Sequence, residues 1–167
     1  DALIAARFVG KGEEVSLITQ DAQQIRFSEQ DVREMGRTAA GVAAMKLKKS
    51  DRIIAADVFK ANSGTQEILV VTERGYGKTT PASEYKLQKR GGSGIRTARI
   101  TEKTGNVVGG AILTADEKAN GELVVMSRRG QVIKLPLADV PSLGRDTQGV
   151  RIMKLREGDA IASVVCF

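Results

Sequence analysis

Short runs of β-branched and aliphatic residues recur along this chain, and a polar turn follows each of them. Three such runs are Val15–Thr19, Ile68–Thr72 and Leu123–Ser127. Gly75 and Gly130 stand in two of the turns, and a second short run such as Gln131–Leu135 comes next. A β-rich run, a tight turn and a second run are typical of a β-hairpin. The pattern therefore predicts three antiparallel hairpins.

These hairpins belong to a longer repeat. Residues 14–41, 67–94 and 122–149 align without a gap, at offsets of 53 and 55 residues. An alternating third run follows, as in Val150–Leu155, and then a fourth, apolar run at residues 53–56, 107–111 and 161–165. Four short strands in about 50 residues are the period of a propeller blade. We therefore expect an all-β, propeller-like array with blades at residues 14–59, 67–113 and 122–167.

The beginning of the chain matches the end of a repeat. Leu3 and Ile4 align with Ile53 and Ile54 of a fourth run. We therefore expect residues 1–9 to form the last strand of a preceding blade. On this interpretation residues 1–167 are one partial array, three blades plus one strand, cut from a longer protein.

Each repeat also carries a glycine turn with an arginine. In the middle copy this turn is Gln88–Gly94, where Lys89 and Arg90 precede three glycines. Arg37 and Arg145 occupy the position of Arg90, and Gly41 and Gly149 occupy that of Gly94. Glycine allows backbone N–H groups to approach an anion closely while the cations supply charge, which suits a phosphate backbone. The same composition also suits a plain connection between strands.

The amino-acid composition limits the classes of function that this chain can have. The 167 residues carry 26 Lys and Arg against 20 Asp and Glu, a net charge of +6 with a pI near 9.6, and this surplus favours an anionic partner. The middle blade holds the largest share, 8 basic against 4 acidic residues. Histidine is absent and Cys166 stands alone, which excludes His-based catalysis, an internal disulfide and a Cys-based zinc site. No membrane span or signal pattern is present, so we expect a cytoplasmic protein.

Three motifs of the chain resemble one known family. They are GYGKTTPASEY (residues 75–85), QKRGGSG (residues 88–94) and GRDTQGVRIMKL (residues 144–155). The second resembles the gyrase A-box, and all three are similar to late blades of the C-terminal domain of the DNA gyrase A subunit. The resemblance implies a β-pinwheel, in which neighbouring blades exchange strands and double-stranded DNA bends around a basic rim. It also implies that the chain is the last three of about six blades.

The family also implies how the chain works. It would be a non-catalytic DNA-wrapping domain that supports ATP-dependent negative supercoiling by a type II topoisomerase. Its partners would be double-stranded DNA, the N-terminal cleavage core of the same polypeptide and the gyrase B subunit. Any ATP and Mg²⁺ would be bound outside this fragment, in which we expect no cofactor, metal or catalytic residue.

The candidate DNA-binding residues lie in two kinds of turn. They are Arg37, Lys89, Arg90, Gly91, Gly92, Gly94 and Arg145 in the glycine turns, and Arg74, Lys78, Arg128 and Arg129 in the hairpin turns, with Lys46, Arg99 and Lys154 on third strands as further candidates. Ser93 departs from the usual box, which has a basic residue there. Two alternatives therefore stay open: the C-terminal domain of the topoisomerase IV A subunit, and a protein-interaction propeller that docks an acidic partner.

Overall fold

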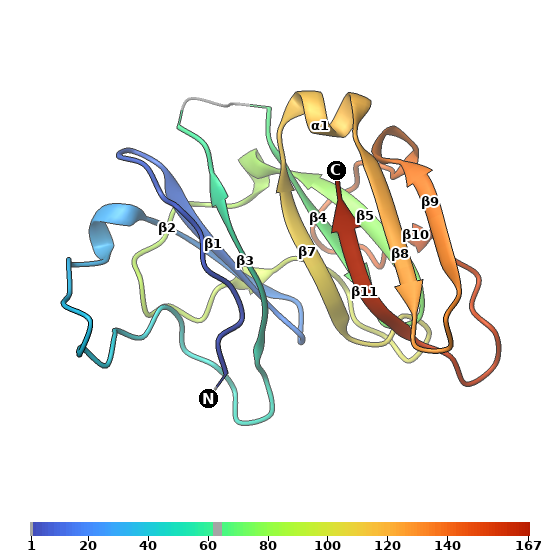
Figure 1. Cartoon of the computed structure of the whole chain (residues 1–167), viewed down its shortest axis with the longest axis horizontal. Helices are drawn as coiled ribbons and strands as arrows, with labels where there is room; N and C mark the ends of the chain where they lie inside the picture. Colours follow the sequence, from blue (N-terminus) through green and yellow to red (C-terminus); the bar gives the residue numbers. More distant parts are fainter. Residues whose placement is uncertain (1, 62–64) are drawn as a thin grey trace.

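The computed structural model describes residues 2–61 and 65–167 and confirms the all-β fold (Figure 1). The strands in these ranges are β1 (Glu14–Thr19), β2 (Gln23–Ser28), β3 (Ile53–Phe59), β4 (Glu67–Thr72), β5 (Tyr76–Pro81), β6 (Ile95–Arg96), β7 (Val107–Leu113), β8 (Glu122–Ser127), β9 (Val132–Pro136), β10 (Val150–Arg151) and β11 (Ile161–Cys166). The helical elements are α1 (Ala115–Asn120) and the 3-10 turns η1 (Glu29–Asp31), η2 (Ala82–Glu84) and η3 (Leu137–Asp139). Nowhere in the described ranges is a helix both long and apolar enough to cross a lipid bilayer.

The three predicted hairpins are present. β1 pairs with β2, β4 with β5, and β8 with β9, all antiparallel. Gly75 and Gly130 adopt positive φ angles of 79° and 82° in the second and third turns. Ala22 occupies the same position of the first turn with a φ of 59°, so a tight turn forms there without glycine.

The fourth run of each repeat is the inner strand of a sheet. β3 pairs with β1, β7 with β4, and β11 with β8. These three inner strands lie next to one another at the centre of the array (Figure 1). Gly109 and Gly110 on β7 permit this approach, because an added Cβ would lie 2.9 Å from Val164 Cγ2 or 2.7 Å from Ile18 Cδ1.

The outer strand of each complete sheet comes from the following repeat. β6 pairs with β2 of the first repeat, and β10 pairs with β5 of the second, which gives the orders β3-β1-β2-β6 and β10-β5-β4-β7. Each of these two sheets therefore combines three strands of one repeat with one strand of the next, as the resemblance to a β-pinwheel implies. The third sheet, β11-β8-β9, has three strands. We use blade one, two and three for the sheets containing β1, β4 and β8.

Glycine makes this strand exchange possible. Gly94 and Gly149 have φ angles of 75° and 77°, and an added Cβ would lie 2.7 Å from Gln24 O and 2.6 Å from Gly77 O. The third run of the first repeat, residues 42–47, forms no strand. A third run pairs with the preceding repeat, and the described residues contain no hairpin before β1 with which residues 42–47 would pair.

The strand predicted for residues 1–9 is not formed over the described residues 2–9, and Asp1 lies outside them. Leu3 and Phe8 are fully or almost fully exposed. Part of the segment nevertheless lies where a neighbouring inner strand would lie. Ile4, Ala5 and Arg7 line a channel of about 240 Å³ together with residues of β3, β7 and β11. A strand needs a paired neighbour for its backbone groups, and no strand among the described residues pairs with this segment.

Candidate nucleic-acid interface

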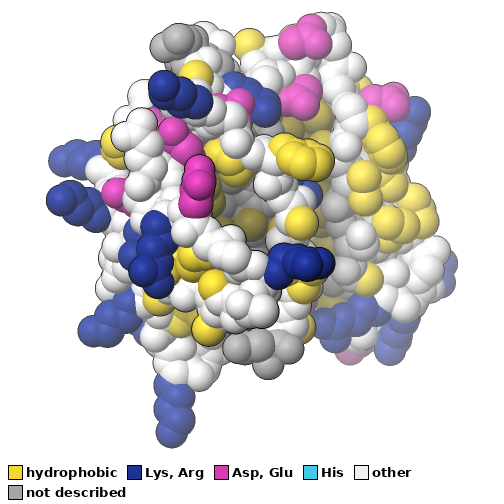
Figure 2. Space-filling view, turned by 60° about the vertical axis from the view of Figure 1, so that its left-hand side comes forward, with side chains coloured by type: hydrophobic (Ala, Val, Ile, Leu, Met, Phe, Trp, Pro, Cys, Tyr) yellow, Lys and Arg dark blue, Asp and Glu magenta, His cyan; other side chains and the backbone are white. Residues whose placement is uncertain are grey.

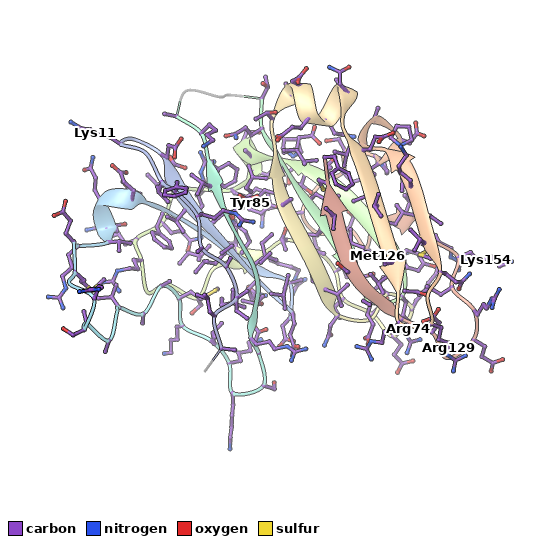
Figure 3. All side chains as sticks on the ribbon, in the orientation of Figure 1. Lys11, Arg74, Tyr85, Met126, Arg129 and Lys154 are labelled. Carbon is purple, nitrogen blue, oxygen red and sulfur yellow. The ribbon has the colours of Figure 1, made fainter. Side chains whose placement is uncertain are left out.

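Cations are spread over the surface, but they gather at the hairpin turns. With blade one turned forward, Lys and Arg side chains follow the left and lower margins while most Asp and Glu side chains lie in the upper half (Figure 2). Arg74, Arg129 and Lys154 lie together at the lower end of blades two and three, and Lys11 lies at the opposite end of blade one (Figure 3). The β4–β5 and β8–β9 hairpin turns therefore mark one basic end of the array.

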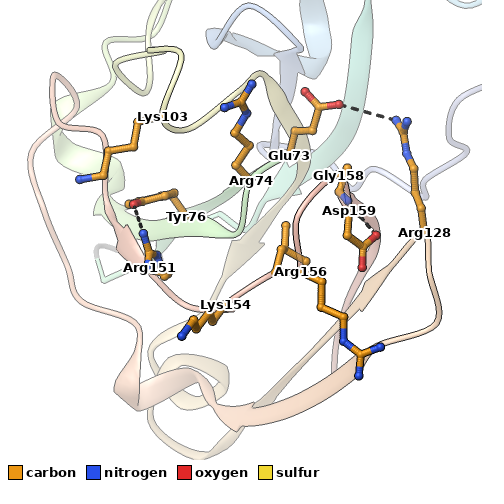
Figure 4. Close-up of a pocket in the computed structure, with 12 residues that line it drawn as sticks. Glu73, Arg74, Tyr76, Lys103, Arg128, Arg151, Lys154, Arg156, Gly158 and Asp159 are labelled. Atoms are coloured by element: carbon orange, nitrogen blue, oxygen red, sulfur yellow. Dashed lines mark hydrogen bonds and ion pairs between the residues drawn. The ribbon is translucent and has the colours of Figure 1, made fainter.

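A pocket of about 670 Å³ opens at this end, between the β4–β5 and β8–β9 hairpins (Figure 4). We call it the inter-blade pocket. Six cations line it: Arg74, Lys103, Arg128, Arg151, Lys154 and Arg156. They come from the two hairpin turns, from the loop before β7 and from residues 151–156 after the third glycine turn. The loops of two repeats thus bring these charges together, although as many as 82 residues separate Arg74 from Arg156 along the chain.

Tyr76 provides a polar centre for this pocket. The Arg151 guanidinium donates a hydrogen bond of 3.1 Å to Tyr76 Oη and lowers the pKa of the phenol. The Lys103 ammonium lies 5.4 Å from the centre of the same ring, and the Arg151 guanidinium lies 5.6 Å from it. These cation–π contacts orient two of the cations around one aromatic ring.

The two carboxylates of the pocket leave most of its positive charge uncompensated. Glu73 Oε1 lies 3.8 Å from the Arg128 guanidinium. Asp159 accepts hydrogen bonds from Ser127 Oγ at 2.6 Å and from the Arg129 N–H at 3.1 Å. Six cations against two carboxylates give the inter-blade pocket a surplus of four positive charges. Such a pocket attracts an anion with several negative charges, and it contains no nucleophile paired with a general base.

Two arginines of the glycine turns, Arg90 and Arg145, bind the preceding repeat instead of pointing freely outward. Arg90 donates to Asp31 O at 3.0 Å and also to Ala43 O. Arg145 repeats the arrangement, donating to Arg96 O at 3.1 Å and lying 3.8 Å from Glu84 Oε2. Carbonyl groups do not cancel a charge, so Arg90 keeps its positive field, whereas Arg145 is partly compensated by Glu84. Both arginines join one repeat to the next.

Lys78 is not a surface residue, and the prediction that it binds DNA is wrong. Its side chain is 1% exposed, and Nζ donates to Gly144 O at 2.6 Å, Arg145 O at 2.8 Å and Thr147 Oγ1 at 3.0 Å. Burial lowers its pKa to about 8. Lys78 lies on β5 rather than in the hairpin turn, and it holds the third glycine turn against blade two.

The other predicted residues are distributed over two surfaces. Arg37 and Lys89 are exposed in the glycine turns, and Arg129 is exposed beside the inter-blade pocket with its guanidinium 2.9 Å from Glu157 O. Gly91 N–H donates to Ala44 O, and Gly92 O accepts from Lys46 N–H, each at 2.8 Å. Gly91, Gly92 and Gly94 thus approach the backbone of the first repeat. Arg99 forms an ion pair of 3.2 Å with Asp146.

Lys103, Arg151 and Arg156 were not among the candidates predicted from the sequence. A cluster of charge in the sequence indicates Arg151 and Arg156, because these two residues and Lys154 are three cations within six residues after the third glycine turn. Lys103 gave no such signal. It stands in a polar turn between Glu102 and Thr104, and only the fold brings it over Tyr76.

Comparisons with known proteins agree with this architecture. The chain matches the family described as "DNA gyrase C-terminal domain, beta-propeller" over residues 13–60, 66–114 and 121–167. It is 45% identical over 164 residues to the DNA gyrase A subunit of Staphylococcus epidermidis and 43% identical to that of Staphylococcus aureus. Each alignment covers 98% of this chain and 18% of the relative. The chain thus spans about a fifth of the length of these curated relatives.

Solved structures show the same fold. A DNA gyrase A C-terminal domain superposes with a TM-score of 0.82 at 29% identity, covering 95% of this chain and 52% of the other. The C-terminal domain of a DNA topoisomerase IV also gives 0.82, at 22% identity, covering 94% and 47%. The family match covers all three repeats, and the chain therefore belongs to the DNA gyrase C-terminal domain family.

Proposed function

We propose that this chain is a non-catalytic domain that binds double-stranded DNA within a type II DNA topoisomerase, and that this enzyme is a gyrase. The observation that carries this proposal is the inter-blade pocket, where six cations face two engaged carboxylates. Membership of the gyrase C-terminal domain family and 43–45% identity to DNA gyrase A subunits support it.

The chemistry of the pocket favours the DNA backbone over the bases. Arginine and lysine side chains pair with phosphate oxygens, and their flexible stems tolerate any sequence. The pocket lies among loops and hairpin turns, which provide no helix or ribbon for the major groove. We therefore expect binding that depends little on sequence and strongly on salt.

Within the parent protein we propose a wrapping role. The exposed cations of the glycine turns, such as Lys89, would continue the path of the DNA from the hairpin end along the outer edge of the sheets. Wrapping would present DNA to the cleavage core of the same polypeptide, which would act with the gyrase B subunit in the cytoplasm. ATP and Mg²⁺ would act in those other parts.

A salt titration of DNA binding tests this function. We expect the logarithm of the association constant for a double-stranded fragment to fall linearly with the logarithm of the salt concentration, by about 0.9 per phosphate contact. Replacing Arg74 and Lys154 together by alanine should reduce that slope by about 1.8, because two contacts are lost.

Lys11 provides the matched control for charge. Lys154→Glu and Lys11→Glu change the net charge equally, but Lys11 lies at the opposite end of the array (Figure 3). Binding that weakens several-fold in Lys154→Glu and little in Lys11→Glu supports the inter-blade pocket. Equal effects of the two substitutions, or binding without salt dependence, would contradict the proposal.

The topoisomerase IV alternative is tested on the parent enzyme. A gyrase should introduce negative supercoils into relaxed plasmid when ATP is present, whereas relaxation without supercoiling would favour topoisomerase IV. The protein-docking alternative requires an acidic protein that binds this fragment while DNA does not.

A further inference from the structure

The charge of the inter-blade pocket belongs to one junction between blades and not to the repeat. At the junction of blades one and two, acidic or polar residues replace three of its cations. These replacements are Asp21 for Arg74, Ser50 for Lys103 and Glu73 for Arg128. Arg96 and Arg99, which correspond to Arg151 and Lys154, both pair there with Asp146, at 3.1 and 3.2 Å. Of these two junctions, only that of blades two and three therefore carries a large positive surplus.

Most cations of the inter-blade pocket have no counter-charge in the fold. Within residues 2–61 and 65–167, Arg128 is the one cation of the six that is ion-paired, to Glu73 at 3.8 Å. The other carboxylate, Asp159, already accepts hydrogen bonds from Ser127 Oγ and from a backbone N–H. Like charges that share a pocket repel one another, and an anion among them removes this repulsion. The pocket is therefore electrostatically incomplete without a ligand.

Two of the unpaired cations are held at one fixed ring (Figure 4). Tyr76 is 5% exposed, so its ring is anchored in the fold. The Arg151 guanidinium donates to Tyr76 Oη at 3.1 Å, and the Lys103 ammonium lies 5.4 Å from the centre of the ring. Gln23 stands at this position in the first repeat and provides no ring. Tyr76 thus brings two cations from different loops to one place, where they can bind one anionic group.

The volume of the inter-blade pocket suits a compact ligand. Its 670 Å³ lies within the range of small-molecule sites, about 300 to 1,000 Å³. A DNA duplex is a stiff rod with its phosphates on the outside, so it can contact the mouth of such a pocket but not fill it. Tyr76 is the aromatic residue of the lining, and its buried ring leaves no face on which a nucleobase could stack. The pocket therefore suits phosphate groups rather than a base.

We propose that the inter-blade pocket binds one compact anion, a chain of two or three phosphate groups, and that this anion and DNA exclude each other. A single phosphate group carries about two negative charges at pH 7, which compensate only part of the surplus of four. In a longer chain, Lys103 and Arg151 hold one phosphate group and the remaining cations compensate the others. The exclusion rests on the proposed function, because it requires these cations to contact DNA as well.

Isothermal titration calorimetry with inorganic triphosphate, at fixed ionic strength, tests the site. We expect one anion per chain and about tenfold weaker binding in Lys103→Ser, which introduces the residue of the other junction. Lys11→Ser is the matched control, since it removes the same charge at the opposite end of the array, and it should bind like the original chain (Figure 3). Circular dichroism confirms that both variants are folded.

The source of the phosphate groups is tested with nucleotides. ATP should bind about as tightly as inorganic triphosphate, and AMP much more weakly, because the pocket recognises the phosphate chain and not the base. Binding of ATP and AMP without binding of inorganic triphosphate would overturn the proposal.

Competition with DNA separates this inference from the proposed function. Inorganic triphosphate should displace a double-stranded fragment from the original chain better than sulfate does at equal ionic strength, and this advantage should be lost in Lys103→Ser. Salt-dependent DNA binding without a triphosphate site, or triphosphate binding that is equal in Lys103→Ser and Lys11→Ser, overturns the inference and leaves the proposed function standing. Triphosphate binding to a chain that does not bind DNA overturns the proposed function and the exclusion, while the anion site itself stands.

Discussion

The ammonium group of Lys78 is enclosed by three oxygen acceptors of the third glycine turn, at 2.6 to 3.0 Å. Its own strand supplies none of them. The sequence pattern assigns this lysine to a hairpin turn, where a lysine is usually exposed, but the structure places it on β5. The repeat itself indicates that this position is buried, because Ile25 and Ile133 occupy it in the other copies. A lysine at an apolar position of a repeat signals a buried cation that needs its own partners.

Removing the charge of Lys78 tests this role. Lys78→Met keeps the apolar stem but removes the ammonium donor of Arg145 O and of Gly144 O, which keeps only the hydrogen bond from Thr147 Oγ1 at 2.9 Å. We expect a loss of about 1.5 to 3 kcal/mol in the free energy of unfolding, as for hydrogen bonds to a charged group. Urea unfolding at pH 7 measures it. DNA binding that falls in proportion to charge, without any loss of stability, would instead restore Lys78 as a surface contact.

The lowered pKa of Lys78 predicts a specific pH dependence. The folded chain releases this proton near pH 8, while the unfolded chain keeps it to the ordinary value of 10.5. Between these values the unfolded state binds more protons, so the contribution of Lys78 to stability rises with pH and is smallest below pH 8. The difference in unfolding free energy between the original chain and Lys78→Met should therefore increase from pH 8 to pH 10. A flat difference would contradict the lowered pKa.

At the scale of the elements, the sequence pattern predicts the hairpins. The periodicity of the sequence does not predict the strand exchange. Hairpin pairing is local, and the run, turn, run pattern contains all of it. β6 and β10 are two residues long, and their partners lie in the preceding repeat, 71 to 75 residues away along the chain. No local pattern specifies which hairpin such a short strand joins. Only the resemblance to the gyrase family implied exchange, and the sheet order confirms it.

The inner strand β7 also depends on contacts that periodicity does not show. Gly110 lies between β3 and β4, and an added Cβ would meet Ile18 Cδ1 at 2.7 Å and Leu69 O at 3.1 Å. We expect Gly110→Ala to cost about 1 to 3 kcal/mol of unfolding free energy through overpacking. Ile18→Val removes the Cδ1 atom, so the cost of Gly110→Ala should be smaller in that background. A double-mutant cycle from urea unfolding gives the coupling, and simple additivity would contradict the contact.

At the scale of the whole molecule, exchanged strands make each blade depend on the next repeat. Stacked repeats usually interact only through neighbouring faces, so that local damage stays local. Here the third repeat supplies β10 to blade two, and Lys78 of blade two binds the third glycine turn in return. The contacts between repeats also determine which residues form the candidate site. The cations of the inter-blade pocket come from two repeats. The sequence identifies the basic turns, but it does not show which of these turns lie next to one another in the fold.

This coupling predicts which strands lose stability after one substitution in the third repeat. Gly149→Ala introduces a Cβ at a φ of 77° and 2.6 Å from Gly77 O on β5. Gly130→Ala introduces one at a φ of 82° with no described heavy atom within 4 Å, so it carries the backbone strain alone, about 1 to 2 kcal/mol. Hydrogen exchange followed by peptide mass spectrometry should show lost protection in β5 for Gly149→Ala and not for Gly130→Ala, although both substitutions lie outside blade two. Protection lost from β8 and β9 while β5 stays protected would mean that each repeat stabilises only its own hairpin.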